Sequence, residues 1–260
     1  MTLKLCLAGA TGHVGQELVK AILASGDLKL VSGVARKSAG QTLIGDARVF
    51  GSVGEALKAA PADVFIDYTH PDAVKANLLA AISAGCHAVV GTSGLSDADY
   101  ADIEAAASKH GVGVFAAGNF SITAALLQHF AAQAARVMPH WEILDYASDT
   151  KPDAPSGTAR ELAYTLGQVT QPKWTVPVES TKGLREARGA SLNGSQLHSV
   201  RVPGYYSAVQ AIFGDVGERI ELRHESNSYA PYVAGTLLAA RKVGSWKGLK
   251  RGMTALMDLG

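Results

Sequence analysis

A lysine stands just ahead of a proline, a serine, a glycine and a threonine in DTKPDAPSGTARELA, residues 149–163. Ser156 is typical of a helix N-cap, and the amides that follow at Gly157 and Thr158 can bind a carboxylate or a phosphate. Lys151 could hold a second acidic group, or give up a proton if burial lowers its pKa. A capped helix with a surface lysine would have the same letters, so this stretch does not decide the chemistry by itself.

A glycine loop near the N-terminus predicts a second anion site. In GATGHVG, Gly9 permits a tight turn, Gly12 lets a pyrophosphate approach, and Gly15 lets helix and strand pack closely. An apolar strand-like run precedes the loop and a helical pattern follows it. That context favours dinucleotide binding over an ordinary strand–helix turn.

The residues after the next strand bear on which dinucleotide is bound. This strand ends in VARK and carries no carboxylate that would bind the ribose hydroxyls of NAD. Arg36 can stack on adenine and pair with a 2′-phosphate. The sequence therefore predicts NADPH, with NADH as the alternative if Arg36 and Lys37 are only solvated loop charges.

Two further loops follow predicted strands at the same sheet edge, where open α/β sheets bind ligands. They are GTSG, residues 91–94, and DYTHP, residues 67–71. His70 could donate a proton there, although a single histidine before a proline is more often a loop residue.

The elements that must position these residues change in type along the chain. The first half alternates strands with helices, which predicts a parallel sheet with helices on its faces. After Met138 a strand and a helix are followed by three strand-like runs without helices between them, which predicts an antiparallel sheet. We expect an α/β chain with a dinucleotide-binding domain over 1–120, a substrate-binding and oligomerisation domain over 121–228, and a helical region over 229–260 that packs back on the first domain.

Composition excludes several classes of protein. The 260 residues include 24 Lys plus Arg and 23 Asp plus Glu, a formal charge of +1 that argues against a nucleic-acid binder. Cys6 and Cys86 lie in apolar runs without nearby ligand residues, so we expect them in the core and expect no metal site. The N-terminal apolar run is too short for a signal peptide, and no membrane-spanning segment is apparent. These features predict a cytoplasmic protein.

Several segments resemble one family. KPDAPSGTA resembles the K-x-D-A-P-S-G-T-A motif of dihydrodipicolinate reductases, also called 4-hydroxy-tetrahydrodipicolinate reductases. GATGHVG is similar to their N-terminal loop, GTSG to their G-T-T-G, and GNFSIT at 118–123 to their N-F-S segment. HSVRVPG and FGDVGERIELRHES are also similar to family sequence. Because the matches run in order along nearly the whole chain, they are more specific together than any one is.

The resemblance implies a Rossmann-type domain, a four-stranded tetramerising domain, and hydride transfer from NAD(P)H to a cyclic imine dicarboxylate of the lysine pathway. Lys151 would occupy the position of the family's catalytic lysine, and the substrate would lie at Ser156, Gly157 and Thr158. The cofactor would contact Gly9, Ala10, Thr11, Gly12, His13, Val14, Arg36, Gly91, Thr92, Ser93, Gly118, Asn119 and Phe120.

The sequence departs from the family in its substrate half. Where the family usually reads E-A-H-H-x-x-K, this chain reads LDYASDTK, with Ala147 and Ser148 in place of the histidines. One histidine is the family's proposed proton donor and the other a substrate ligand, and neither can be carried over. The stretch 201–211 also lacks the Glu-His pair of R-x-G-x-x-G-E-H-T.

Loss of a general acid lowers a rate by about a hundredfold or more. Lys151, the Tyr146 phenol or water could replace it, and Lys151 is favoured because its position matches. Tyr205 and Tyr206 would help to shape a different pocket. The sequence thus leaves open an NADPH-dependent reductase of this imine dicarboxylate, a related reductase with another imine or keto acid substrate, and an NADPH-binding sensor without catalysis.

Overall fold

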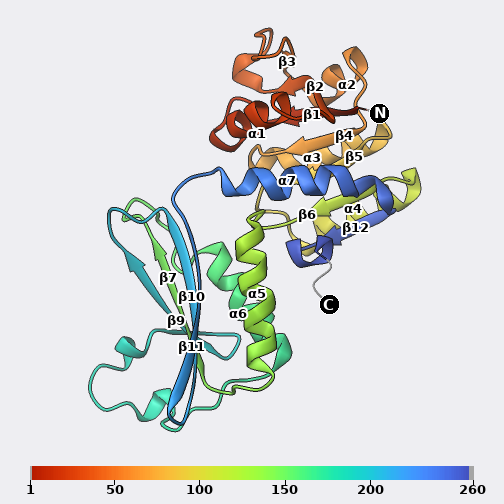
Figure 1. Cartoon of the computed structure of the whole chain (residues 1–260). Helices are drawn as coiled ribbons and strands as arrows, with labels where there is room; N and C mark the ends of the chain where they lie inside the picture. The colour runs from red at the N-terminus through yellow and green to blue at the C-terminus, as the bar shows by residue number, and fades with distance from the viewer. Residues whose placement is uncertain (1, 258–260) are drawn as a thin grey trace. The chain divides into compact units, whose positions relative to one another are not determined.

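The computed structural model describes residues 2–257, so residue 1 and residues 258–260 of the expected ranges lie outside the described residues. The chain forms two compact units (Figure 1). The first contains the residues up to Ile122 and those from Tyr229 onward, and the second contains Thr123–Ser228.

The first unit is built on a seven-stranded parallel sheet of order β12-β6-β5-β4-β1-β2-β3. Most of the central strands are buried along their length, as expected for runs rich in Val, Ile and Leu between two helical layers. The strands are β1 (Leu3–Ala8), β2 (Leu28–Val34), β3 (Arg48–Phe50), β4 (Val64–Asp67), β5 (His87–Val90), β6 (Gly113–Ala116) and β12 (Gly248–Arg251).

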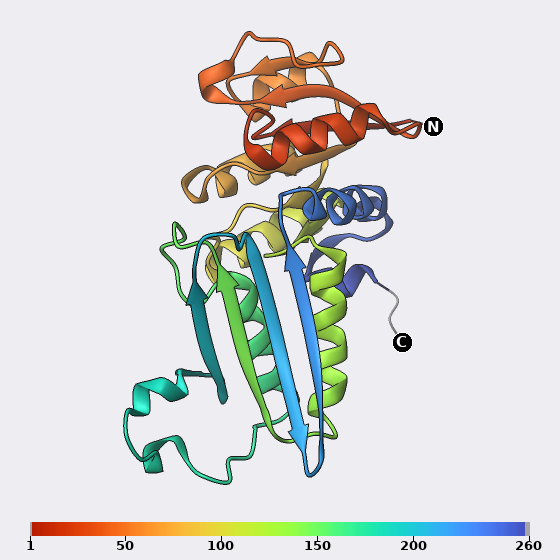
Figure 2. The same ribbon diagram turned by 60° about the vertical axis from the view of Figure 1, so that its left-hand side comes forward.

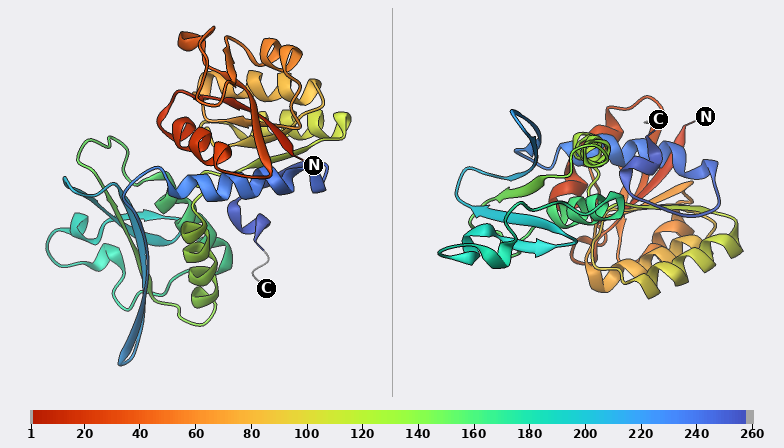
Figure 3. Two further views of the ribbon diagram at one scale, coloured as in Figure 1. Left: turned by 45° about the horizontal axis from the view of Figure 1, so that its top comes forward. Right: turned by 90° about the horizontal axis from the view of Figure 1, so that it is seen from below.

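Helices cover both faces of this sheet (Figure 3). One face packs against α2 (Val53–Ala59), α3 (Pro71–Ser83) and α4 (Asp97–His110), and the other against α1 (His13–Leu23) and α7 (Pro231–Lys242). The chain reverses its direction across the sheet between β1 and β4, and that reversal point is where ligands bind in such folds. The predicted α/β fold with a Rossmann-type parallel sheet is therefore confirmed.

The second unit has a five-stranded mixed sheet of order β11-β10-β7-β9-β8. Its strands are β7 (Trp141–Ala147), β8 (Ala190–Leu192), β9 (Ser195–Arg201), β10 (Ser207–Asp215) and β11 (Glu218–Ser226). Most pairs are antiparallel, as predicted, but β7 and β9 run parallel. The chain returns through α6 (Gly157–Val169) and a long excursion between these two strands, which permits the parallel pairing. The sheet has five strands, whereas the resemblance implies four.

Both helices of the second unit pack on one face of its sheet (Figure 2). They are α5 (Ile122–Ala135) and α6 (Gly157–Val169). The strand β7 alternates strictly, so Ile143, Asp145 and Ala147 are buried on the helix face, whereas Leu144 and Tyr146 lie on the opposite face. This alternation decides which side chains of β7 can reach the start of α6.

Candidate functional site

The loop between β1 and α1 depends on close backbone contacts. Gly9 has a φ of +79°, and a Cβ atom on Gly15 would collide with the Gly9 carbonyl oxygen. Gly12 is the N-cap of α1 and supplies no side-chain cap, and the first turn carries no acidic residue. The amides at the start of α1 are therefore not satisfied by a capping side chain, as an anion site requires.

A cavity of about 350 Å³ lies at the carboxyl ends of the central strands of the first unit. Its walls come from the glycine loop and from the loops that follow β4 and β5. The cavity brings together predicted cofactor residues from two distant stretches of sequence, namely Gly12, His13, Val14, Gly91, Thr92 and Ser93.

The Thr92 hydroxyl is used by other residues of the protein and is not available to a ligand in this cavity. Its hydroxyl lies 2.7 Å from Asp67 Oδ1 and accepts the Thr69 amide at 2.7 Å. Contact between Thr92 and a cofactor would therefore involve the backbone rather than the hydroxyl.

The other predicted cofactor residues do not line this cavity. Ala10 is buried, and the Phe120 ring is only 2% exposed because it packs against Phe115 and Tyr68. The Phe120 carbonyl oxygen packs against Gly235 of α7. Cofactor contacts of Gly9, Ala10, Thr11 and Gly118, Asn119, Phe120 stay predictions.

Arg36 lies at the same sheet edge as the glycine loop, because β2 is the parallel neighbour of β1. β2 ends at Val34, and Arg36 opens a short 3₁₀ turn, Arg36–Ser38, with an exposed side chain. The turn carries no acidic residue. The local charge therefore suits a phosphate better than bare ribose hydroxyls.

Sequence reasoning missed several residues of the cavity wall. Tyr229 stacks on His13 with the ring centroids 5.2 Å apart and the planes within 1° of parallel. Tyr68 packs against Gly91, and its hydroxyl lies 2.6 Å from Thr236 Oγ1, where burial raises the pKa of the phenol. No local pattern connects Tyr229 with the glycine loop. Residues 68–71 follow a strand, which was the available signal for Tyr68, Thr69 and Pro71.

His70 has a structural role in the described chain. It is the N-cap of α3, and its Nδ1 accepts a hydrogen bond from the Asp72 amide at 3.3 Å. The capping hydrogen bond gives His70 a structural role, and no contact of the described residues supports a role as proton donor.

The start of α6 in the second unit has the predicted cap. The Ser156 hydroxyl accepts the Ala159 amide at 3.3 Å, and the Ser156 side chain is buried. The Ser156 amide donates to Asp145 Oδ2 at 2.8 Å, so it is already used. The Ser156 amide is therefore taken by Asp145, whereas a Cβ atom on Gly157 would meet open space.

A buried ion pair fixes the loop that leads into α6. Arg201 Nη2 lies 2.7 Å from Asp145 Oδ2, and the same nitrogen donates to the Asp153 carbonyl oxygen at 2.8 Å. The side chain of Asp145 is 1% exposed. Breaking such a pair costs about 3–5 kcal/mol, so the loop and the helix end are held as one piece.

Lys151 lies on this same loop. Its ammonium is 2.7 Å from Asp153 Oδ1, and the lysine side chain is 36% exposed. The hydrogen bond from Lys151 lowers the pKa of Asp153. The lysine is thus paired and partly exposed, and the deep burial that sequence reasoning considered for it is absent.

Tyr146 points away from the start of α6. Strand alternation places it on the face opposite Asp145, where its hydroxyl donates to Gln210 Oε1 at 3.2 Å. Its ring lies 5.1 Å from that of Tyr205 and 4.7 Å from the Arg223 guanidinium. Tyr205 therefore belongs to this aromatic cluster on the open face of the sheet.

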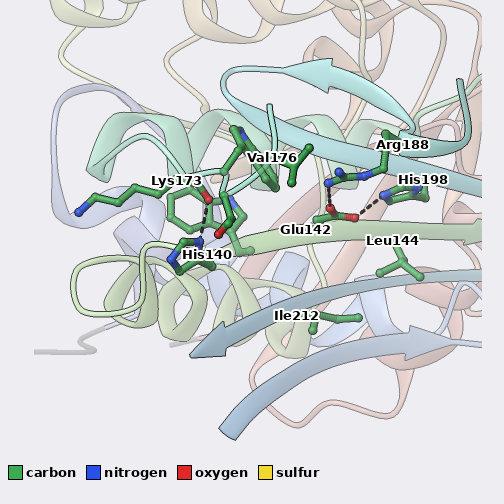
Figure 4. Close-up of a pocket in the computed structure, with 11 residues that line it drawn as sticks. His140, Glu142, Leu144, Lys173, Val176, Arg188, His198 and Ile212 are labelled. Carbon is green, nitrogen blue, oxygen red and sulfur yellow. Dashed lines mark hydrogen bonds and ion pairs between the residues drawn. The ribbon is translucent and has the colours of Figure 1, made fainter. Parts of the chain in front are cut away.

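A second hollow lies on the open face of the second unit's sheet, with a volume of about 620 Å³ (Figure 4). Glu142 lies between Arg188 and His198, at 2.5 Å and 2.6 Å. The Arg188 contact ties the excursion after α6 to the sheet, and the His198 contact joins β9 to β7. Apolar side chains Leu144, Val176 and Ile212 complete the wall.

Neither membrane nor metal sites are found in the part of the chain that the structure describes. None of its helices combines the length and apolarity needed to span a bilayer. Its His, Cys, Asp and Glu side chains form no group that could hold a metal ion. Cys6 and Cys86 are buried, as predicted.

Comparison with known proteins covers almost the whole chain. Family models described as dihydrodipicolinate reductase, N-terminus and C-terminus, match residues 3–120 and 123–259. A 4-hydroxy-tetrahydrodipicolinate reductase of Desulfitobacterium hafniense is 33% identical over 98% of this chain and 99% of its own. One from Mycolicibacterium smegmatis is 38% identical over 96% of this chain and 97% of its own.

Solved structures agree with these matches. A dipicolinate-bound dihydrodipicolinate reductase from Paenisporosarcina sp. TG-14 has a TM-score of 0.89 at 29% identity, covering 99% of this chain and 100% of its own. An amine dehydrogenase from Mycobacterium smegmatis has a TM-score of 0.66 at 13% identity, covering 96% and 95% of the two chains, which shows a shared fold only.

Proposed function

The chain belongs to the dihydrodipicolinate reductase family. We propose that one of its two anion sites binds the cofactor and the other binds the substrate of a single hydride transfer. The chain is an oxidoreductase that uses NAD(P)H, and its activity is that of a 4-hydroxy-tetrahydrodipicolinate reductase of the diaminopimelate and lysine pathway. The reduced nicotinamide, when bound, supplies the hydride. The residues of this chain bind and orient the cofactor and the substrate, and they supply the charges that pair with the phosphates and carboxylates.

The first unit binds the dinucleotide. The uncapped amides of α1 receive the pyrophosphate, and the exposed guanidinium of Arg36 receives the 2′-phosphate of NADPH. The stacked rings of His13 and Tyr229 form a side wall beside the phosphate site. These contacts support NADPH as the preferred form.

The second unit binds the dicarboxylate. One substrate carboxylate accepts the amides of Gly157 and Thr158, and the Lys151 ammonium pairs with the other acidic group. The observation that carries this proposal is the anchoring of the loop by Asp145 and Arg201, because it fixes the helix end and the lysine on one rigid segment.

Lys151 also supplies the proton in place of the family's histidine. A C=N group that accepts hydride must gain a proton at nitrogen as the reaction proceeds. Lys151 is an accessible N–H donor on the loop before α6, whereas Ala147 has no proton to give and Tyr146 lies on the opposite face of β7. Asp153 holds the ammonium in place until substrate arrives.

The decisive experiment uses purified protein, NADPH and freshly made 4-hydroxy-tetrahydrodipicolinate, and follows the loss of reduced nicotinamide. We expect turnover by the wild type and a loss of about a hundredfold or more in kcat for Lys151→Ala. Tyr146→Phe is the matched control, because its hydroxyl is on the other sheet face, and should retain kcat within about twofold.

Two outcomes would contradict the proposal. Turnover of another imine or keto acid, with none of this substrate, would favour the related-reductase alternative. Tight NADPH binding with no turnover of any such acid would favour a sensor.

We further propose that the chain self-associates, as a tetramer, through the open face of the second sheet, and that it acts in the cytoplasm. The open face carries Leu144 and Ile212 together with Glu221 and Arg223 of β11, and the excursion after α6 packs on part of it. A broad sheet face on which apolar side chains lie among paired charges is typical of an interface with another protein chain.

A further inference from the structure

We propose that Asp67 is a positioning residue for the dinucleotide, and this inference rests on the proposed binding of NADPH to the first unit. Asp67 is the last residue of β4 and has no exposed surface. It lies directly behind the loops that follow β4 and β5, and both loops line the cofactor cavity. Sequence reasoning gave Asp67 no role.

The carboxylate holds the two loops together through a chain of donors. Asp67 Oδ1 accepts the Thr69 amide at 3.0 Å, the Thr69 hydroxyl at 2.7 Å and the Thr92 hydroxyl at 2.7 Å. The Thr92 oxygen in turn accepts the Thr69 amide at 2.7 Å. One oxygen atom therefore fixes the relative position of both loops.

The second carboxylate oxygen connects the same cluster to a helix. Asp67 Oδ2 accepts Asn77 Nδ2 of α3 at 2.9 Å. Within residues 2–257 the carboxylate has no ion-pair partner, so neutral donors must satisfy it. A buried carboxylate tolerates such a setting only when its donors stay in place, because an unsatisfied buried charge is costly.

The arrangement explains why Thr92 is turned inward. A hydroxyl spent on Asp67 cannot bind a ligand, but it fixes the backbone of Gly91, Thr92 and Ser93 at the cavity wall. Asp67 thus acts on the cofactor through the loop backbones that it holds, and never touches the cofactor itself. Preorganised backbone groups of this kind lower the cost of ordering a ligand site.

The test measures the Kd for NADPH directly, together with the temperature of unfolding. We expect Thr92→Val, which removes the hydroxyl at similar size, and Asp67→Asn to raise the Kd about fivefold to tenfold. We expect the KM for NADPH to rise equally, with kcat at saturating NADPH within about twofold of the wild type. Ile103→Val, a buried change in α4 away from the cavity, is the control for lost stability, and its Kd should be unchanged.

An exchange of the partners makes the test sharper. In Asp67→Asn the new amide can pair with Asn77 only after one of the two amide groups turns over, because both amide nitrogens are donors. Adding Asn77→Asp restores one donor and one acceptor, and we expect the double variant to recover the NADPH affinity to within about twofold of the wild type. A folded double variant that fails to recover would overturn the proposal.

The proposal is also overturned if Thr92→Val and Asp67→Asn lower the unfolding temperature while the Kd for NADPH stays within twofold of the wild type. These outcomes are separate from those that test the reductase. A wild type that binds NADPH without turnover contradicts the proposed function but leaves the role of Asp67 to be decided by the Kd values.

Discussion

Arg36 is the residue on which the choice between the two nicotinamide cofactors depends. Its guanidinium is exposed just after β2, and the turn that it opens has no acidic residue that could bind the ribose hydroxyls of NAD. We expect Arg36→Ala to raise the KM for NADPH about tenfold, since a charge-assisted hydrogen bond contributes about 1.5–3 kcal/mol. The KM for NADH should change by less than about twofold, because NADH has no 2′-phosphate.

Steady-state kinetics with each cofactor measure this difference. Lys37→Ala, at the next position of the same turn, is the control and should have the smaller effect on NADPH. Equal weakening of both cofactors by Arg36→Ala would contradict the assignment to the 2′-phosphate.

Single residues also show where sequence reasoning stops. The Ser156 cap could be predicted from its spacing, since capping is local. The use of its amide by Asp145 could not, because that contact depends on how β7 and α6 pack. The direction of Tyr146 could not be predicted for the same kind of reason, since it is set by the register of the whole strand.

At the scale of elements, His224 joins β11 to the start of α5. The imidazole is buried, and its Nδ1 lies 2.9 Å from Thr123 Oγ1. Burial lowers the pKa of His224, opposed in part by Glu225. The folded state therefore favours the neutral ring, and its contribution to stability is complete above the unfolded pKa of about 6.5. That contribution is lost as the pH falls from this value toward the lower folded pKa.

We expect His224→Gln to reduce the loss of stability between about pH 7.5 and about pH 5.5, since glutamine does not titrate. Urea unfolding at the two pH values measures the difference between the variant and the wild type. His110→Gln, on the exposed end of α4, is the control. An unchanged pH dependence in His224→Gln would show that the ring does not drive the acid sensitivity.

Elements with a strong periodic pattern were predictable, and short or directional features were not. The helices at α1, α3, α4, α6 and α7 follow from apolar spacing and punctuation such as Pro71 at the start of α3. The three-residue strands β3 and β8 are too short to leave a pattern. The parallel direction of β7 and β9 depends on the route of the chain and has no local signal.

At the scale of the whole molecule, the open face of the second sheet predicts self-association. We expect Leu144→Arg to shift the wild-type assembly toward smaller species, because a charge would replace an apolar side chain at the centre of this face. Sedimentation velocity measures the change. Phe130→Arg, exposed on α5, is the control and should leave the assembly intact. A monomeric wild type would contradict the proposal.

The strand β12 pairs with β6, and α7 covers the sheet beside α1, so the last described part of the chain completes a unit that the first part began. During synthesis on the ribosome, the nascent segment up to Ile122 would have β6 paired with β5 on one edge, and the other edge of β6 would stay unpaired until residues 248–251 emerge. A prematurely terminated product would keep that sheet margin open to other chains, which is a setting for aggregation. Because β12 is synthesised late, the edge of β6 in the first unit is covered only near the end of translation.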